Sequence, residues 1–278
     1  MNYFKLDIKR LISSKIVRLV LLVLLSIAII DPLTVLFHFS KYVDLVERIG
    51  RNPFQFWMLM NSVSWGNNLY NIMFWIVAVL FTSLIYFEDK NTSMYMLQIT
   101  RGNKNKYLIS KLLSTWLFSF VVMLVVLEIN IIITYIVFPE NMILSEYYYR
   151  LVPNEGTFVY DAFTSNPMKM VQIYTVLNAF TISIFAVFSL CIQMLIKFSN
   201  RYIALLLPVI ILYGINFIFD SLPILFTYNI RMIVQPRATS ALEFIITWEN
   251  VLLTIGGWIL VNCILIFIVF FRSRDCYE

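Results

Sequence analysis

The chain has 278 residues, of which 60% are hydrophobic and only 13% charged, and its mean hydropathy is +0.81. This composition excludes an ordinary soluble globular domain, because the apolar residues come in runs of about 20, the length that spans a bilayer as a helix. The net charge of +5 matches a basic cytoplasmic face beside anionic lipid and does not indicate nucleic-acid binding.

The hydropathy pattern predicts an all-α polytopic membrane protein that forms one domain over residues 1–278. Six spans are expected, over Val17–Phe37, Leu69–Phe87, Leu112–Phe138, Val171–Ile196, Tyr202–Phe219 and Val251–Phe271. An even number of spans places both ends of the chain on one side. Most Lys and Arg residues fall on that side, so we expect both termini to be cytoplasmic.

The segment before the first span, residues 1–16, has the pattern of an amphipathic helix that lies in the membrane surface. Its apolar positions recur at helical spacing and its basic residues take the opposite face: Phe4, Ile8, Leu11 and Ile12 against Lys5, Lys9, Arg10 and Lys15. The alternative is a positively charged anchor for the first span. Either interpretation places the segment on the cytoplasmic side.

The polar insert between the second and third predicted spans, residues 88–111, is the most informative stretch of the chain. Its basic residues place it on the cytoplasmic side of a membrane. Within it, the apolar and polar residues of Ser93–Ile99 could form a short amphipathic helix, whose apolar side chains would enter a groove on a partner. The alternative is a solvated loop that carries only the ordinary excess of positive charge.

The sequence lacks the combinations of residues that usually carry catalysis. His38 is the one histidine of the sequence, and no His-Glu-x-x-His helix or Gly-x-x-x-x-Gly-Lys phosphate loop is present. We therefore expect no catalytic residues, no metal site and no cofactor on this chain.

Acidic residues inside the spans are costly in hydrocarbon and need a cavity, a polar partner or protonation. Glu128, two residues before Asn130 in the third span, fits either a pathway or subunit contact or a protonated helix-packing residue. Asp31, just before Pro32, is expected to be structural.

An outer segment separates the fifth and sixth spans, from Asp220 to Asn250. It contains two apolar runs, Leu222–Phe226 and Leu242–Trp248, that are too short to cross a bilayer. We expect them to form re-entrant or interfacial helices on the outer side.

Several of these features resemble the membrane permeases of the ABC-2 type. Residues 4–15 are similar to the elbow helix of that family, and Asp89-Lys90 followed by Thr100-Arg101, Lys106-Tyr107 and Lys111 resembles its coupling loop. Asn200-Arg201-Tyr202 with Pro208 resembles the entry to the fifth span, and the short apolar pieces after Asp220 resemble the outer re-entrant segment.

The resemblance implies a permease subunit of an ABC exporter in a bacterial plasma membrane. It would pair with a second permease, identical or homologous, and a separate ATPase subunit would bind ATP and Mg²⁺. The residues expected to contact that ATPase are Glu88, Asp89, Lys90, Tyr95, Leu97, Arg101, Lys104, Tyr107 and Lys111. The expected cargo is an amphipathic or antimicrobial peptide or another hydrophobic compound. The alternative function is a membrane-bound peptide-sensing or immunity protein that does not pump.

Overall fold

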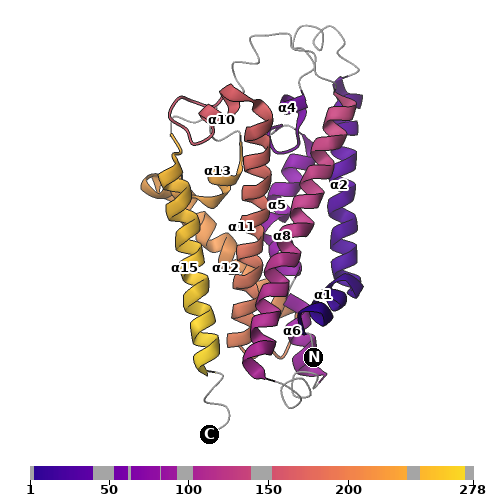
Figure 1. Ribbon diagram of the computed structural model, residues 1–278, viewed down its shortest axis with the longest axis vertical. Helices are drawn as coiled ribbons and strands as arrows, with labels where there is room; N and C mark the ends of the chain where they lie inside the picture. Colours follow the sequence, from indigo (N-terminus) through magenta and orange to yellow (C-terminus); the bar gives the residue numbers. More distant parts are fainter. Residues whose placement is uncertain are drawn as a thin grey trace.

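The computed structural model describes residues 3–39, 53–61, 64–81, 83–92, 103–138, 152–236 and 245–272, and these residues form a helical bundle without strands (Figure 1). The elements are α1 (Tyr3–Ser13), α2 (Lys15–Phe39), α4 (Pro53–Phe56), α5 (Trp65–Leu80), α6 (Ser83–Asn91), α8 (Lys104–Val137), α10 (Tyr160–Ser165), α11 (Pro167–Leu195), α12 (Arg201–Ser221), the 3₁₀ helix η1 (Pro223–Tyr228), α13 (Ile230–Val234) and α15 (Trp248–Arg272). The all-α prediction is confirmed for this part of the chain.

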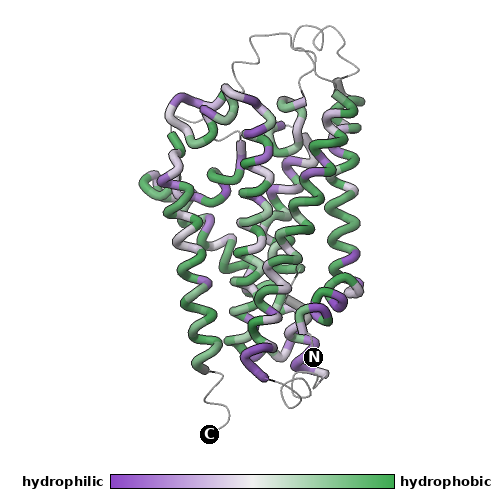
Figure 2. Tube along the Cα trace, in the orientation of Figure 1, coloured by the Kyte–Doolittle hydropathy of each residue, from purple (hydrophilic) through white to green (hydrophobic). Residues whose placement is uncertain are grey.

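Five of the described helices, α2, α8, α11, α12 and α15, are long and apolar enough to cross a membrane. They match five of the six predicted spans, and their length and composition indicate a membrane-embedded protein. Figure 2 shows apolar residues along the length of the bundle and polar residues gathered toward its two ends. The beginning of α1 and the end of α15 lie at the same end of the bundle; which side of the membrane this end faces stays a prediction.

The second predicted span, Leu69–Phe87, is not one continuous helix. It is divided into α5, in the upper part of Figure 1, and α6, at the lower end, and residue 82 between them lies outside the described residues. A sixth continuous span is therefore not confirmed. The apolar run holds no Gly or Pro, the residues that ordinarily signal an interruption, so its pattern predicted a single helix.

The central helix of the bundle is α11. In its most apolar stretch 89% of the residues are buried, against 22% for α12 and 17% for α15. The helices α8, α5 and α15 pack around it. Because α12 and α15 expose many of their large apolar side chains, these two helices require hydrocarbon or another protein surface around them.

Among the described residues between α12 and α15, the structure has two short helices, η1 and α13. The first predicted run lies partly in η1, whereas the described part of the second, Ile245–Trp248, is irregular until α15 begins. The backbone here finds partners inside the protein, because Asn178 Nδ2 on α11 donates to the Val234 carbonyl oxygen at 2.8 Å. Whether the segment re-enters the membrane stays a prediction.

Candidate functional site at the base of the bundle

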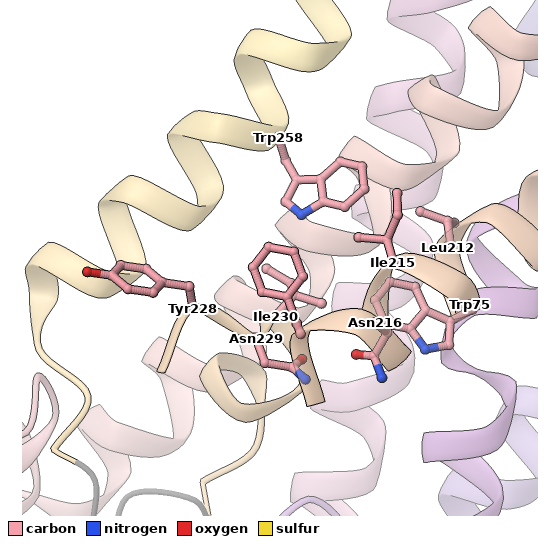
Figure 3. A pocket seen from close by; sticks show the side chains of 9 residues that line it. Trp75, Leu212, Ile215, Asn216, Tyr228, Asn229, Ile230 and Trp258 are labelled. Carbon is pink, nitrogen blue, oxygen red and sulfur yellow. The ribbon is translucent and has the colours of Figure 1, made fainter. Parts of the chain in front are cut away.

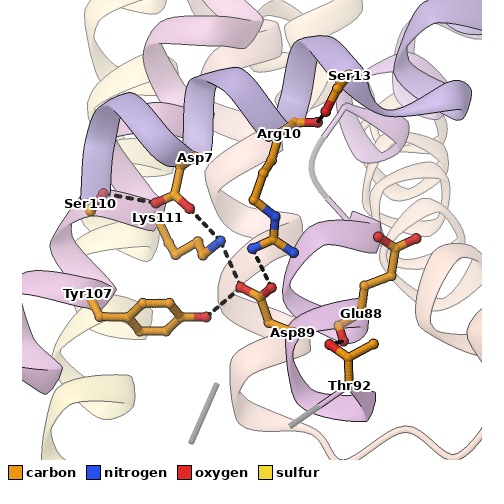
Figure 4. A network of polar contacts seen from close by, with 9 residues as sticks. All are labelled: Asp7, Arg10, Ser13, Glu88, Asp89, Thr92, Tyr107, Ser110 and Lys111. Atoms are coloured by element: carbon orange, nitrogen blue, oxygen red, sulfur yellow. Dashed lines mark hydrogen bonds and ion pairs between the residues drawn. The ribbon is translucent and has the colours of Figure 1, made fainter. Parts of the chain in front are cut away.

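Three helices meet at the end of the bundle where α1 lies, and they bring charged side chains together in its interior (Figure 4). The helices are α1, the last turn of α6 and the beginning of α8. The side chains involved are Asp7, Arg10, Asp89, Tyr107, Ser110 and Lys111. We refer to these six residues as the basal network.

The local sequence sets up the geometry of α1 and α8. Tyr3, Asp7 and Leu11 are spaced four residues apart, so they share one face of α1, and all three are buried. Asn103 caps α8, since its side-chain oxygen accepts from the backbone N–H of Asn105 at 2.8 Å. The helix therefore begins early enough to place Lys111 in its second turn.

Lys111 is the centre of the basal network. Its Nζ lies 2.6 Å from Asp7 Oδ1 and 2.8 Å from Asp89 Oδ2, and none of the three side chains is more than 3% exposed. The same Nζ lies 5.4 Å from the centre of the Tyr107 ring. One ammonium thus joins α8 to both α1 and α6.

Asp89 and Asp7 each have a further partner. The Tyr107 hydroxyl donates to Asp89 Oδ2 at 2.9 Å, and the Ser110 hydroxyl donates to Asp7 Oδ2 at 2.9 Å. Arg10 NH1 lies 2.5 Å from Asp89 Oδ1, an ion pair by distance that lacks hydrogen-bond geometry. Arg10 is the member of the basal network that reaches the surface, with 28% of its side chain exposed.

The charges of the basal network cancel, because two carboxylates face one ammonium and one guanidinium. An isolated buried ion costs several kcal/mol, so each charge requires the others. The basal network therefore fixes α1, α6 and α8 relative to one another. Residues 93–102, which connect α6 to α8 in the sequence, lie outside the described residues.

The predicted loop of residues 88–111 is shorter than expected, because α6 continues to Asn91 and α8 already begins at Lys104. Asp89, Tyr107 and Lys111 are buried, so in this structure they hold helices together and present no surface to an ATPase. Glu88 and Lys90 are exposed and Lys104 is half-buried, so they can still meet a partner. Tyr95, Leu97 and Arg101 lie outside the described residues, and their contact with an ATPase stays a prediction.

The acidic position in the third predicted span contacts α11. Gln172 Nε2 donates to Glu128 Oε2 at 3.3 Å, and Glu128 is half-buried, so its role in a pathway stays a prediction. Asn130 is fully buried, and its Nδ2 donates to the Ala28 carbonyl oxygen at 2.9 Å. In this structure Asn130 therefore packs α8 against α2 and lines no exposed surface.

Asp31 has a structural role in this fold. It is fully buried, and its Oδ1 accepts from the backbone N–H of Gly66 at 2.8 Å. That N–H belongs to the first turn of α5, where helix donors lack partners of their own. The carboxylate of α2 thus caps a neighbouring helix.

Sequence reasoning missed Asp7, Arg10 and Ser110 as members of a site, and Arg10 was assigned to the outward basic face of α1. A signal for Asp7 was present: it lies four residues from both Tyr3 and Leu11, so an acid interrupts the buried face of the helix. An acid in that position needs a cation on the neighbouring element.

The described residues contain no group of three or more His, Cys, Asp or Glu side chains that could hold a metal ion. Comparison of the chain with family models, with curated proteins and with solved structures found no match. The functional interpretation therefore depends on the geometry described above and on the sequence pattern.

Proposed function

We propose that this chain is the membrane subunit of an ABC-type exporter, driven by a separate ATPase that binds at the end of the bundle containing the basal network. The observation that carries the proposal is the basal network itself. It joins the end of α6 to the beginning of α8, the two helices that residues 93–102 connect in the sequence, and this segment is the one expected to contact the ATPase. A segment that transmits motion needs a rigid base, and paired buried charges supply one.

The packing supports a route for that motion into the bundle. Asp89 lies at the end of α6 and Lys111 near the start of α8, so a displacement of residues 93–102 acts on both helices and, through Asp7, on α1. The helix α6 also packs against α12, and Arg201 NH2 on α12 lies 3.8 Å from Glu88 Oε1. ATP would change the bundle only by favouring one arrangement over another.

The exposed apolar faces of α12 and α15 support a second permease or lipid as a lateral partner. The proposed cargo is an amphipathic or hydrophobic compound, including antimicrobial peptides. The alternative function, a sensing or immunity protein, predicts the same membrane bundle without a motor. Binding of an ATPase therefore separates the two functions.

The test is co-purification of the tagged full chain with an ATPase subunit that carries a phosphate loop. Leu97→Asp should reduce ATPase retention by about tenfold or more, because a charge would enter an apolar contact. Ile224→Asp is the matched control at the opposite end of the bundle, where Ile224 is 87% exposed, and it should retain the ATPase as the natural chain does.

Two results would contradict the proposal. One is a natural chain that retains no ATPase and supports no ATP-dependent movement of peptide or lipophilic compounds in vesicles, which would favour the sensing protein. The other is equal retention by Leu97→Asp and the natural chain, which would remove residues 93–102 from the contact.

A further inference from the structure

An apolar groove of about 510 Å³ runs between α12, η1 and α15. Its walls are Ile215 and Phe219 from α12, Leu225 from η1, and Leu253 and Val261 from α15. It lies between the two spanning helices that are least buried, so it opens where hydrocarbon or a second chain would cover the protein. A groove of this character accepts an alkyl chain.

A small space beside the groove shares part of its lining (Figure 3). Trp258 and Tyr228 belong to both, while Trp75, Asn216 and Asn229 line only the small space. This space has a volume of about 10 Å³, which is room for a single water-sized group. A ligand whose chain fills the groove can therefore place only a compact head here.

One polar atom at the small space, the side-chain carbonyl oxygen of Asn216, has no hydrogen-bond partner within the described part of the chain. Asn216 Nδ2 donates to Asp220 Oδ2 at 2.8 Å, and Asn229 Nδ2 donates to Asp220 Oδ1 at 2.5 Å. The Asn229 carbonyl oxygen already accepts from the Arg231 backbone N–H. The Asn216 carbonyl oxygen is buried without a hydrogen-bond partner among the described atoms, and Asn216 as a whole is only 8% exposed.

The charge nearest this space is negative: Asp220 is exposed and lines neither cavity, but its carboxylate accepts from the side chains of Asn216 and Asn229, which line the small space. Asp220 forms no ion pair within the described part of the chain, and the two amides orient its carboxylate without neutralising it. The rings of Trp75, Tyr228 and Trp258 add electron-rich faces that attract a cation. A donor that is positively charged satisfies the buried oxygen, the carboxylate and the rings together.

We infer that this site binds a long-chain primary amine in its ammonium form, with the alkyl chain in the groove and the head in the small space, where it donates to the Asn216 carbonyl oxygen near Asp220. A trimethylammonium head is too bulky for the small space and has no N–H to donate. A neutral alcohol lacks the charge that Asp220 would attract. A phosphate-bearing lipid head would bring a second negative charge to the carboxylate. The site belongs to this chain alone and needs no ATPase.

The test is saturation binding of radiolabelled dodecylamine to the full chain in phosphatidylcholine nanodiscs at neutral pH, where a primary amine is protonated. Empty nanodiscs supply the background. We expect one saturable site per chain, and dodecyltrimethylammonium and dodecanol should compete about tenfold more weakly or worse. Binding without saturation, or equal competition by all three amphiphiles, would mean that the groove holds bulk lipid and would overturn the inference.

Two neighbouring glycines of α15 give a matched pair of variants. A Cβ at either Gly256 or Gly257 would meet nothing within 4 Å, so each accepts a larger residue, but only Gly257 lines the groove. Gly257→Leu should weaken dodecylamine binding by about tenfold or more, while Gly256→Leu should stay within about twofold. Equal affinities for both variants would place the amine elsewhere.

The charge is tested separately. Asp220→Asn should weaken dodecylamine binding by about tenfold and leave dodecanol competition unchanged, and the exposed Asp161→Asn on α10 should change neither. Loss of binding with Asp161→Asn as well would indicate a nonspecific surface effect. Crosslinking between two copies of the chain supplies a further outcome. If Gly257→Leu abolished this crosslinking and dodecylamine left it unchanged, the groove would instead be assigned to a second copy of the chain.

Discussion

Replacing Lys111 by Met tests the basal network most directly. The variant keeps most of the side-chain volume and removes the ammonium that lies 2.6 Å from Asp7 and 2.8 Å from Asp89. Arg10 then remains as the one cation of the basal network for two buried carboxylates. Removing one partner of a buried ion pair costs about 3–5 kcal/mol, because the remaining charge stays buried and unpaired. We expect the free energy of unfolding to fall by that amount.

The double variant Asp7→Asn with Lys111→Met separates charge balance from packing. It removes one negative and one positive charge, leaves Asp89 with Arg10, and keeps a side-chain oxygen that can accept from Ser110. We expect the double variant to recover about 2 kcal/mol relative to the sum of the two single variants, within the range measured for coupled neighbours. That recovery is the energy of the Asp7–Lys111 contact.

Unfolding by SDS titration in mixed micelles, followed by circular dichroism of the full chain, measures all three variants. Lys106→Met is the control, since Lys106 is exposed in the first turn of the same helix, and it should change the free energy by less than about 0.5 kcal/mol. Strictly additive losses for Asp7→Asn and Lys111→Met would refute the coupling. If Lys106→Met lowered the free energy of unfolding as much as Lys111→Met does, the effect would be assigned to net charge.

Three further predictions concern packing and topology. Gly66→Ala should destabilise the bundle by about 1–3 kcal/mol in the same titration, because the added Cβ would lie 2.4 Å from Asp31 Oδ1. Gly214→Ala is the control and should leave the stability unchanged, because its added Cβ would meet nothing within 4 Å. Asn178→Leu should lower the free energy of unfolding by about 2–4 kcal/mol, because the Tyr70 hydroxyl and the Val234 carbonyl each lose a hydrogen-bond partner. The control is Thr164→Val on the exposed helix α10. If Asn178→Leu lowered the free energy of unfolding less than Thr164→Val does, the prediction would be contradicted. In a chain without its natural cysteines, Lys90→Cys should react with an impermeant maleimide only in opened cells and Asp161→Cys in intact cells, and the reverse pattern would invert the topology.

The sequence was sufficient to predict the helical class and the positions of most spans, since these depend on long apolar runs that hydropathy detects. The beginning of α11 and the end of α12 fall within a few residues of the expected positions. The division between α5 and α6 could not be predicted, because no helix-breaking residue marks it. The positions of η1 and α13 depend on contacts such as that between Asn178 and Val234, which join residues far apart in the chain.

The candidate site was predictable in location and not in its contacts. The charges of residues 88–111 indicated a polar end of the bundle, and the structure brings Asp89, Tyr107 and Lys111 together there. Whether a given charge points outward or inward depends on the element packed against it, and Asp7 on α1 is 104 residues from its partner Lys111 in the sequence. The pattern within residues 88–111 therefore predicted that Lys111 is the exposed end of a loop, because its partner Asp7 lies in a different segment of the sequence.

The burial of Asp7 changes how α1 should be understood. An amphipathic helix that only lay in the membrane surface would direct an apolar face inward, and its acid would be free to stay in water. Here the inward face of α1 carries an acid between two apolar residues, and that acid is paired with a lysine of α8 at 2.6 Å. Such a contact fixes the register of α1 along the bundle, because a shift of one turn would leave two charges buried and unpaired. Any movement of α6 or α8 must then carry α1 with it, while the exposed Lys5 and Lys9 keep contact with the surroundings.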